Sequence, residues 1–92
     1  MDVVSTSPAR LMGLASKGRL EPGADADIVV IDPTDERLIK TRNLHQKADC
    51  TPYEGMVVRG GPRHVWLRGE PIIFGRQPSG YAGQGRFVPR TL

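Results

Sequence analysis

The sequence predicts a mainly β protein built from short strands and tight turns. Its 92 residues include 11 Gly and 8 Pro, which end regular elements and form turns. The apolar residues fall in short runs, such as the β-branched residues 28–31 (IVVI), a pattern typical of strands. The chain has the length of one small domain and is too short for a catalytic (β/α)8 barrel, which needs roughly 250 residues.

Charge is distributed unevenly along the chain, whose net charge is +3. Residues 1–56 carry seven basic and nine acidic side chains, whereas residues 57–92 carry six Arg and a single acid, Glu70. The Arg residues are mostly spaced well apart, without the interleaved aromatic residues of a nucleic-acid module. We therefore expect no nucleic-acid partner, and a solvated or subunit-facing basic surface.

The chain contains no segment that predicts a membrane span or an exported protein. Its apolar runs are far shorter than the roughly 20 residues a span needs, and its N-terminus lacks the order of a signal peptide. Cys50 is the only cysteine, which excludes an internal disulfide and a thiolate zinc cluster. The sequence therefore predicts a cytoplasmic protein with no membrane partner.

Residues 5–14 (STSPARLMGL) predict a short helix. Ser7 or Thr6 suits the N-cap, Pro8 suits the first turn, and Gly13 can end the helix with a positive φ. The packed face is expected to hold three apolar residues: Leu11, Met12 and Ala15. Ser7 has no base near it in the sequence, so capping is favoured over a nucleophilic role.

Residues 17–33 (KGRLEPGADADIVVIDP) predict a turn, a short strand at 18–20, a type II turn at Pro22-Gly23 and a central, two-sided buried strand at 28–31. Three acids flank these elements: Asp25, Asp27 and Asp32. At strand ends, a short carboxylate accepts bonds from turn N–H groups. The segment lacks the remaining ligands, the central Gly and the terminal Glu of a calcium loop, so these acids predict no calcium site.

Residues 34–52 give a weaker pattern, either an exposed strand or an irregular crossing segment. His45, Asp49 and Cys50 lie within six residues and suggest zinc, but His64, the other histidine, is fourteen residues from Cys50. Zinc sites recruit three or four ligands at closer spacings. The favoured interpretation is therefore a polar loop with one buried cysteine.

The last third of the chain predicts strands at 56–59, 64–68 and 71–74. Gly69-Glu70 is expected to form a type II′ hairpin connection. Alternation places Val65 and Leu67 on a core face, with His64, Trp66 and Arg68 opposite.

Trp66 suits either a stacking platform or, as is more usual for a lone Trp, packing against a neighbouring subunit or helix. Residues 77–92 read as a Gly-rich arm with Tyr81 and Phe87 as anchors.

Four motifs in this order, STSPARLMGL, KGRLEPGADADIVVIDP, TPYEGMVVRGGPRHVWLRGEPI and GQGRFVPR, resemble the C-terminal end of the cyclic amidohydrolases. The resemblance is greatest to dihydropyrimidinases and hydantoinases, and next to allantoinases and dihydroorotases. It covers essentially the whole chain. The most specific part is TPYEGM followed by RG, since GADADIVV recurs across the wider amidohydrolase superfamily.

The resemblance implies a mainly β chain: the C-terminal part of the small β-sandwich of the amidohydrolase fold, with a short helix left from the barrel. Residues 1–16 would be that helical remnant, residues 17–76 the sandwich strands, and residues 77–92 an arm at subunit contacts. A sheet cut from its N-terminal strands leaves edges and apolar faces that seldom stay bare. We therefore expect a homo-oligomer.

The resemblance also implies the chemistry of the family, in which a metal-bound hydroxide attacks a cyclic amide carbon and an Asp moves the proton. The metal, typically zinc, is held on the barrel by an His-x-His pair, a bridging lysine and further His and Asp residues. No His-x-His occurs here, and neither His45 nor His64 has a matching context. We therefore assign no catalytic, cofactor-binding or metal-binding residue, and expect no cofactor in this chain.

Two functions follow as hypotheses. One is a non-catalytic scaffold belonging to a cyclic amidohydrolase. The other is a stand-alone β interaction module that associates with itself or with a separate barrel subunit.

Overall fold

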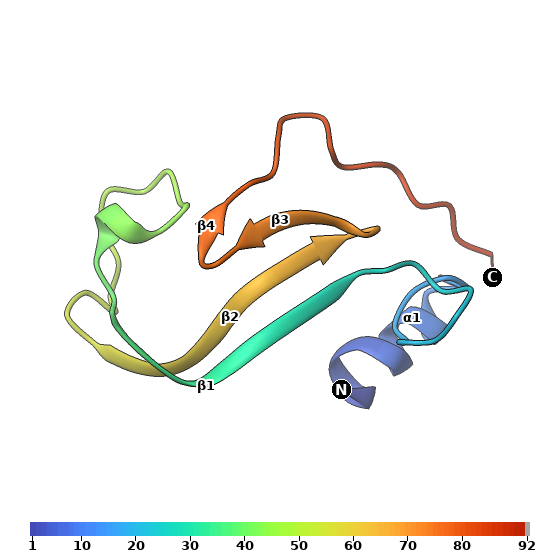
Figure 1. Cartoon of the computed structure of the whole chain (residues 1–92), viewed down its shortest axis with the longest axis horizontal. Helices are drawn as coiled ribbons and strands as arrows, with labels where there is room; N and C mark the ends of the chain where they lie inside the picture. Colours follow the sequence, from blue (N-terminus) through green and yellow to red (C-terminus); the bar gives the residue numbers. More distant parts are fainter. Residues whose placement is uncertain (92) are drawn as a thin grey trace. The chain divides into compact units, whose positions relative to one another are not determined.

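The computed structural model of the chain describes residues 1–91. Its four strands form one sheet in the order β1-β2-β3-β4, with a short helix before them (Figure 1). The regular elements are a π-helical turn (Asp2–Thr6), α1 (Ser7–Leu11), β1 (Ile28–Leu38), a 3-10 helix (Thr41–Asn43), β2 (Val57–Leu67), β3 (Glu70–Phe74) and β4 (Gln77–Pro78). The predicted mainly β fold with one N-terminal helix is confirmed.

The chain divides into two compact units, one of residues 1–30 with 63–92 and one of residues 31–62. The first unit contains α1, the start of β1, the end of β2, and β3 and β4. The second contains the rest of β1, the 3-10 helix and the start of β2. The helical segments of residues 1–91 are all too short or too polar to cross a lipid bilayer.

Helix α1 is not capped by the hydroxyl groups that the sequence suggested. Thr6, at the N-cap position, has helical φ and ψ of −66° and −50° because the π-helical turn leads directly into it. The Thr6 hydroxyl instead donates to the carbonyl of Gly18 at 2.6 Å, and the Ser7 hydroxyl donates to the carboxylate of Asp2 at 3.0 Å. Both side chains therefore fix the chain around α1.

The buried face of α1 is also different from the predicted one. Ala9 is buried, whereas Leu11 is 80% exposed, and Met12 and Ala15 are exposed as well. Gly13 ends the helical segment with a φ of +69°, as predicted.

Strand β1 is longer and more exposed than expected. It continues through Asp32 and Pro33 to Leu38, and it stands at one end of the strand order. Side chains on both of its faces are exposed, including Val29 at 55% and Val30 at 41%. The prediction of a central, buried strand is therefore wrong. An edge position tolerates Pro33, which has no N–H to donate to a neighbouring strand.

In residues 17–27, the predicted type II turn is present but the predicted short strand is absent. The Ala24 N–H donates to the Glu21 carbonyl at 3.1 Å and Gly23 has a φ of +91°, which confirms the type II turn at Pro22-Gly23. Residues 18–20 form no strand. Gly18 has a φ of +78° where the chain passes close to α1.

Strand β2 runs without interruption from Val57 to Leu67, where the sequence suggested two shorter strands. The β2–β3 connection is Arg68-Gly69, because Leu67 pairs with Glu70. Both turn residues have positive φ, 49° and 81°, as a type I′ hairpin requires. The predicted type II′ connection at Gly69-Glu70 is therefore wrong by one residue and in type.

Three aromatic rings gather where β2 and β3 face each other. The His64 ring lies 5.6 Å from that of Trp66 and 4.6 Å from that of Phe74, centroid to centroid. The Gly75 N–H donates to Nδ1 of His64 at 3.0 Å. His64 and Trp66 thus share a face, as the alternation predicts, and they pack on their own hairpin.

Candidate functional site

The most connected group of charged side chains lies in the loop before β1. The Lys17 ammonium lies 2.8 Å from the carboxylate of Asp25 and 2.6 Å from that of Asp27. The Ser16 hydroxyl also donates to Asp25, at 2.9 Å. Lys17 is 14% exposed, and the two carboxylates are about one third exposed. Both acids therefore hold a lysine, where the sequence suggested turn acceptors alone.

The pKa values of these groups shift as an ion cluster requires. The hydrogen bonds to Asp25 and Asp27 raise the pKa of Lys17 above its ordinary 10.5. The bond from Lys17 lowers the pKa of Asp25 below its ordinary 3.8. Burial raises the pKa of Asp27, but the bonds from Lys17 and from the Arg68 backbone outweigh it, so the net shift is downward. All three groups are held in their charged forms.

Asp27 also links this loop to the β2–β3 turn, because its carboxylate accepts the Arg68 backbone N–H at 2.9 Å. The neighbouring Gly69 N–H donates to the Ala26 carbonyl at 3.0 Å. The remaining predicted acceptor, Asp32, takes the Thr34 backbone N–H at 2.9 Å within β1. These acids therefore serve as structural acceptors, and Asp32 does so inside a strand, away from the strand end where we expected it.

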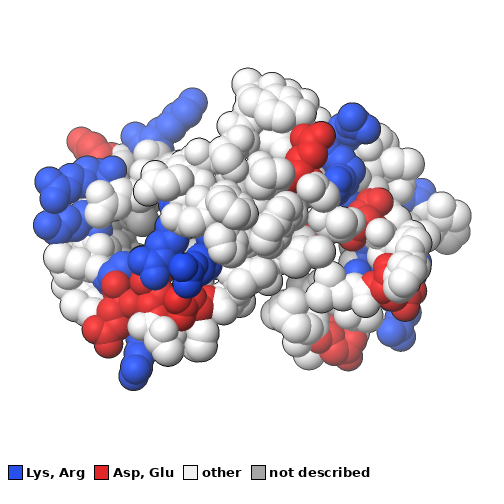
Figure 2. All heavy atoms as spheres, viewed as in Figure 1, with Lys and Arg blue, Asp and Glu red and all other residues white. Residues whose placement is uncertain are grey.

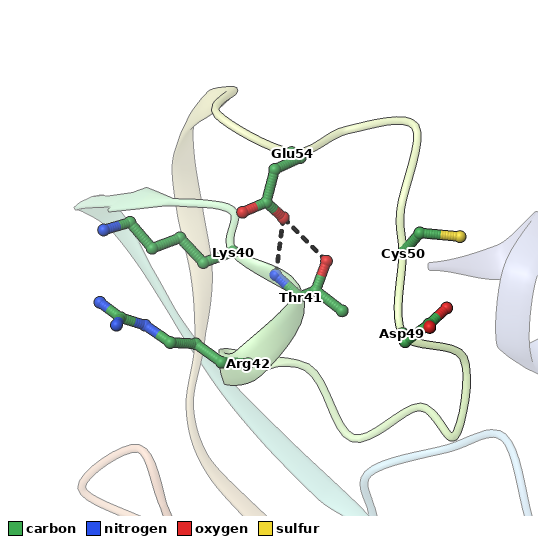
Figure 3. Close-up of a pocket in the computed structure, with 6 residues that line it drawn as sticks. All are labelled: Lys40, Thr41, Arg42, Asp49, Cys50 and Glu54. Carbon is green, nitrogen blue, oxygen red and sulfur yellow. Dashed lines mark hydrogen bonds between the residues drawn. The ribbon is translucent and has the colours of Figure 1, made fainter.

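A shallow hollow of about 590 Å³ lies at the surface of the unit formed by residues 31–62 (Figure 3). Its lining is polar apart from Cys50: Lys40, Thr41, Arg42, Asp49, Cys50 and Glu54. The Glu54 carboxylate accepts both the backbone N–H and the hydroxyl of Thr41, at 2.7 and 2.9 Å. Glu54 thereby caps the 3-10 helix, and a carboxylate at a helix N-terminus is stabilising. These two bonds therefore hold the segments at Thr41 and Glu54 together.

A second hollow, of about 330 Å³, lies beside α1 in the other unit. It is lined by Thr6, Ala9, Arg10, Gly13, Leu14, Ala15, Lys17, Arg19 and Thr91. Of its charged groups, Lys17 belongs to the ion cluster and Arg19 lies 2.7 Å from the carboxylate of Glu21. Its lining brings together no nucleophile and base.

The residues considered for zinc are not assembled into a site. Cys50 is exposed, contrary to the predicted buried cysteine, and it lies at the end of the exposed loop of residues 44–50. Asp49 lines the same hollow as Cys50. His64 belongs to the other unit, where it packs on the ring of Phe74. Within residues 1–91, no group of three or more His, Cys, Asp and Glu side chains could hold a metal ion. The described residues therefore do not fit the divalent metal that the family resemblance implies.

Basic and acidic side chains lie close together over the visible face of the molecule. Figure 2 shows Lys and Arg atoms beside Asp and Glu atoms in several places. Basic and acidic atoms are thus interspersed on this face. Arg59 lies 3.9 Å from the carboxylate of Glu36.

The sequence did not reveal the partners of Lys17, Arg68 and Gln84. The signal for Lys17 was available, since it lies in the same loop as the two acids and a turn separates them. Arg68 and Asp27 are 41 residues apart, and no local pattern indicates a contact over that distance.

Comparison with known proteins identifies what this chain is similar to. A family model described as the amidohydrolase family matches residues 1–73. The D-hydantoinase of Geobacillus stearothermophilus is 45% identical over 92 residues, covering 99% of this chain and 20% of that enzyme. A D-phenylhydantoinase of Escherichia coli is 43% identical over 91 residues, covering 98% of this chain and 20% of that enzyme.

Solved structures give the same result. The dihydropyrimidinase from Brevibacillus agri NCHU1002 matches with a TM-score of 0.87 and 42% identity, covering 95% of this chain and 19% of that one. A D-hydantoinase (dihydropyrimidinase) from Thermus sp. matches with a TM-score of 0.86 and 36% identity, covering 94% of this chain and 19% of that one. This chain spans about a fifth of the length of these enzymes, and by sequence and by structure it belongs to the amidohydrolase family.

Proposed function

We propose that this chain is a non-catalytic, C-terminal scaffold segment of a metal-dependent cyclic amidohydrolase. The enzyme would hydrolyse the cyclic amide C–N bond of a hydantoin or a dihydropyrimidine. The observation that carries this proposal is the 45% identity to a D-hydantoinase along essentially the whole chain. The divalent metal and its ligands would belong to the remaining four fifths of the enzyme.

The burial of side chains supports a role within a larger protein. Among residues 1–91, Ala9, at 7% exposure, is the one buried apolar residue. Large apolar side chains remain exposed on the strands, such as Val57 at 67% and Phe74 at 58%. A domain of this size normally buries about 60% of the surface of its unfolded chain. The rest of the enzyme would supply the atoms that cover these side chains.

A segment exchange tests the scaffold role. The matching residues of the Geobacillus D-hydantoinase are replaced by this chain, and hydantoin ring opening is measured with the metal supplied. We expect the fused enzyme to keep its activity within about tenfold, because the exchange replaces scaffold and leaves the catalytic residues in place. The host truncated before the exchanged segment is the control and should be inactive. A soluble, metal-loaded fused enzyme without turnover would contradict the proposal.

The chain alone should hydrolyse none of the family's ring substrates. Purified protein is assayed with dihydrouracil, hydantoin, allantoin and dihydroorotate, with added zinc or manganese. Because the described residues offer no metal-ligand set, we expect no turnover above buffer. Metal-dependent ring opening that follows the protein through successive purification steps would overturn this expectation.

The second candidate function is a stand-alone β module that associates with itself or with a separate barrel subunit. The exposed apolar side chains of β1 and β2 favour it, since such surfaces are normally covered. Light scattering coupled to size exclusion at micromolar concentration distinguishes the two. A discrete, folded homo-oligomer supports the module, whereas a chain that folds only within the fused enzyme supports the scaffold segment.

A further inference from the structure

Arg68 occupies a backbone conformation that an arginine rarely adopts. Its φ is 49°, in the left-handed region, and it precedes Gly69 in the β2–β3 turn. Type I′ turns favour Asn or Gly at this position, because a Cβ atom makes the left-handed conformation unfavourable. An arginine here indicates that the side chain makes contacts that offset the backbone cost.

Arg68 is bonded on two sides. Its backbone N–H donates to the Asp27 carboxylate at 2.9 Å, which fixes the turn against the Lys17 cluster. Its guanidinium donates to the backbone carbonyl of Gln84 at 2.5 Å. Gln84 lies in the C-terminal segment, so one residue connects the N-terminal loop, the hairpin and the segment that follows β4.

Gln84, whose carbonyl accepts the hydrogen bond from Arg68, makes further hydrogen bonds through its side chain. Gln84 is buried at 7% exposure, although its neighbours along the chain are exposed. Its amide donates to the Glu70 carboxylate at 3.2 Å and accepts the Tyr81 backbone N–H at 3.3 Å. The Tyr81 hydroxyl donates to the same carboxylate at 3.0 Å, and this bond raises the pKa of Tyr81.

Residues 79–91, here called the strap, are attached to the first unit at each end. The N–H groups of Ser79 and Gly80 donate to the Ile72 carbonyl at 3.0 and 3.3 Å. The Thr91 N–H donates to the Gly13 carbonyl at 2.9 Å. The strap is thus bonded at residues 79–84 and at Thr91, and between these two points Phe87 is 90% exposed.

We propose that Arg68 is the latch of this strap: its left-handed turn conformation directs the guanidinium onto Gln84 and holds residues 79–91 on their own hairpin. The backbone cost at Arg68 is retained because the latch bond requires the side chain at that position. Loss of the latch loosens the strap around Tyr81 and Gln84 while leaving the hairpin formed. The bonds of Ser79, Gly80 and Thr91 do not involve Arg68 and remain.

Amide hydrogen exchange of the 92-residue chain tests the latch. The reporters are the Tyr81 and Gln84 amides, and the reference is the Arg76 N–H, which donates to the Arg63 carbonyl at 3.0 Å. Arg68→Met removes the latch and keeps the backbone cost, whereas Arg68→Gly removes both. We expect the reporters to exchange at least about tenfold faster relative to the reference in both variants, as loss of a charge-assisted bond implies.

Two controls separate the latch from charge and from unfolding. Arg59→Met removes another β2 arginine and should leave the reporters unchanged, whereas Arg68→Lys should give an intermediate rate. A variant that unfolds accelerates the reference as well, and the same substitutions are then measured in the fused enzyme. Reporter exchange within twofold of the unsubstituted chain in both Arg68→Met and Arg68→Gly would overturn the proposal.

Discussion

Replacing Gly18 with Ala is expected to destabilise the first unit by about 2–4 kcal/mol. Gly18 has a φ of +78°, which costs an L-residue about 1 kcal/mol or more. A Cβ there would lie 2.7 Å from the Ala9 Cβ and 2.8 Å from the Ser5 carbonyl oxygen. Because the Ser5 oxygen is a backbone atom, the chain must shift to make room. Overpacking of this kind costs about 1–3 kcal/mol. Urea titration followed by the fluorescence of Trp66, the only Trp, measures the loss.

Gly23→Ala is the matched control for this substitution. Gly23 also has a positive φ, +91°, but a Cβ there meets nothing within 4 Å. The variant should therefore lose only the backbone contribution, about 1 kcal/mol. Equal losses for the two variants would show that the close approach to α1 is unimportant.

Replacing Lys17 with Met should destabilise the same unit by about 1–2 kcal/mol. The substitution keeps the apolar stem and removes the ammonium, so Asp25 and Asp27 lose their shared partner. The magnitude lies between that of exposed ion pairs and that of well-buried charged hydrogen bonds. The same urea titration applies. Lys40→Met, at the surface hollow of the other unit, should change stability little, and a comparable loss there would argue against a special role for Lys17.

The pH dependence of stability gives a second measurement on the Lys17 cluster. The pKa values of Asp25 and Asp27 are lowered on folding, so their contribution is present above about pH 3.8 and lost as the pH falls further. The pKa of Lys17 is raised, so its contribution is present below pH 10.5 and lost as the pH rises through the folded value. Lys17→Met should flatten the stability curve at both ends. An unchanged acid limb in that variant would show that other carboxylates dominate.

The features that sequence predicted well are local ones. The turn at Pro22-Gly23 was predictable because Pro and Gly favour the φ angles of the two central positions of a type II turn. The family was predictable because the motif TPYEGM and its neighbours are specific in order and spacing. The end of α1 at Gly13 followed from the same conformational preference of glycine.

The features that sequence reasoning missed depend on distant contacts. Strand β1 was expected to be buried because residues 28–31 are apolar, but among residues 1–91 no strand lies beyond it. The predicted hairpin turn was placed one residue too late, because Gly69 was taken as its first residue. In the structure Arg68 is the first turn residue, although its φ is positive. That choice becomes intelligible only through Asp27 and Gln84, which are 41 and 16 residues away.

The enclosure of Lys17 has a consequence for chemical labelling of this protein. Amine-reactive esters attack the neutral amine, and Lys17 is held charged and largely covered by two carboxylates. The other lysines, Lys40 and Lys47, both belong to residues 31–62. A fluorophore or cross-linker applied at neutral pH would therefore attach to the α-amino group, Lys40 and Lys47, and would leave Lys17 unmarked.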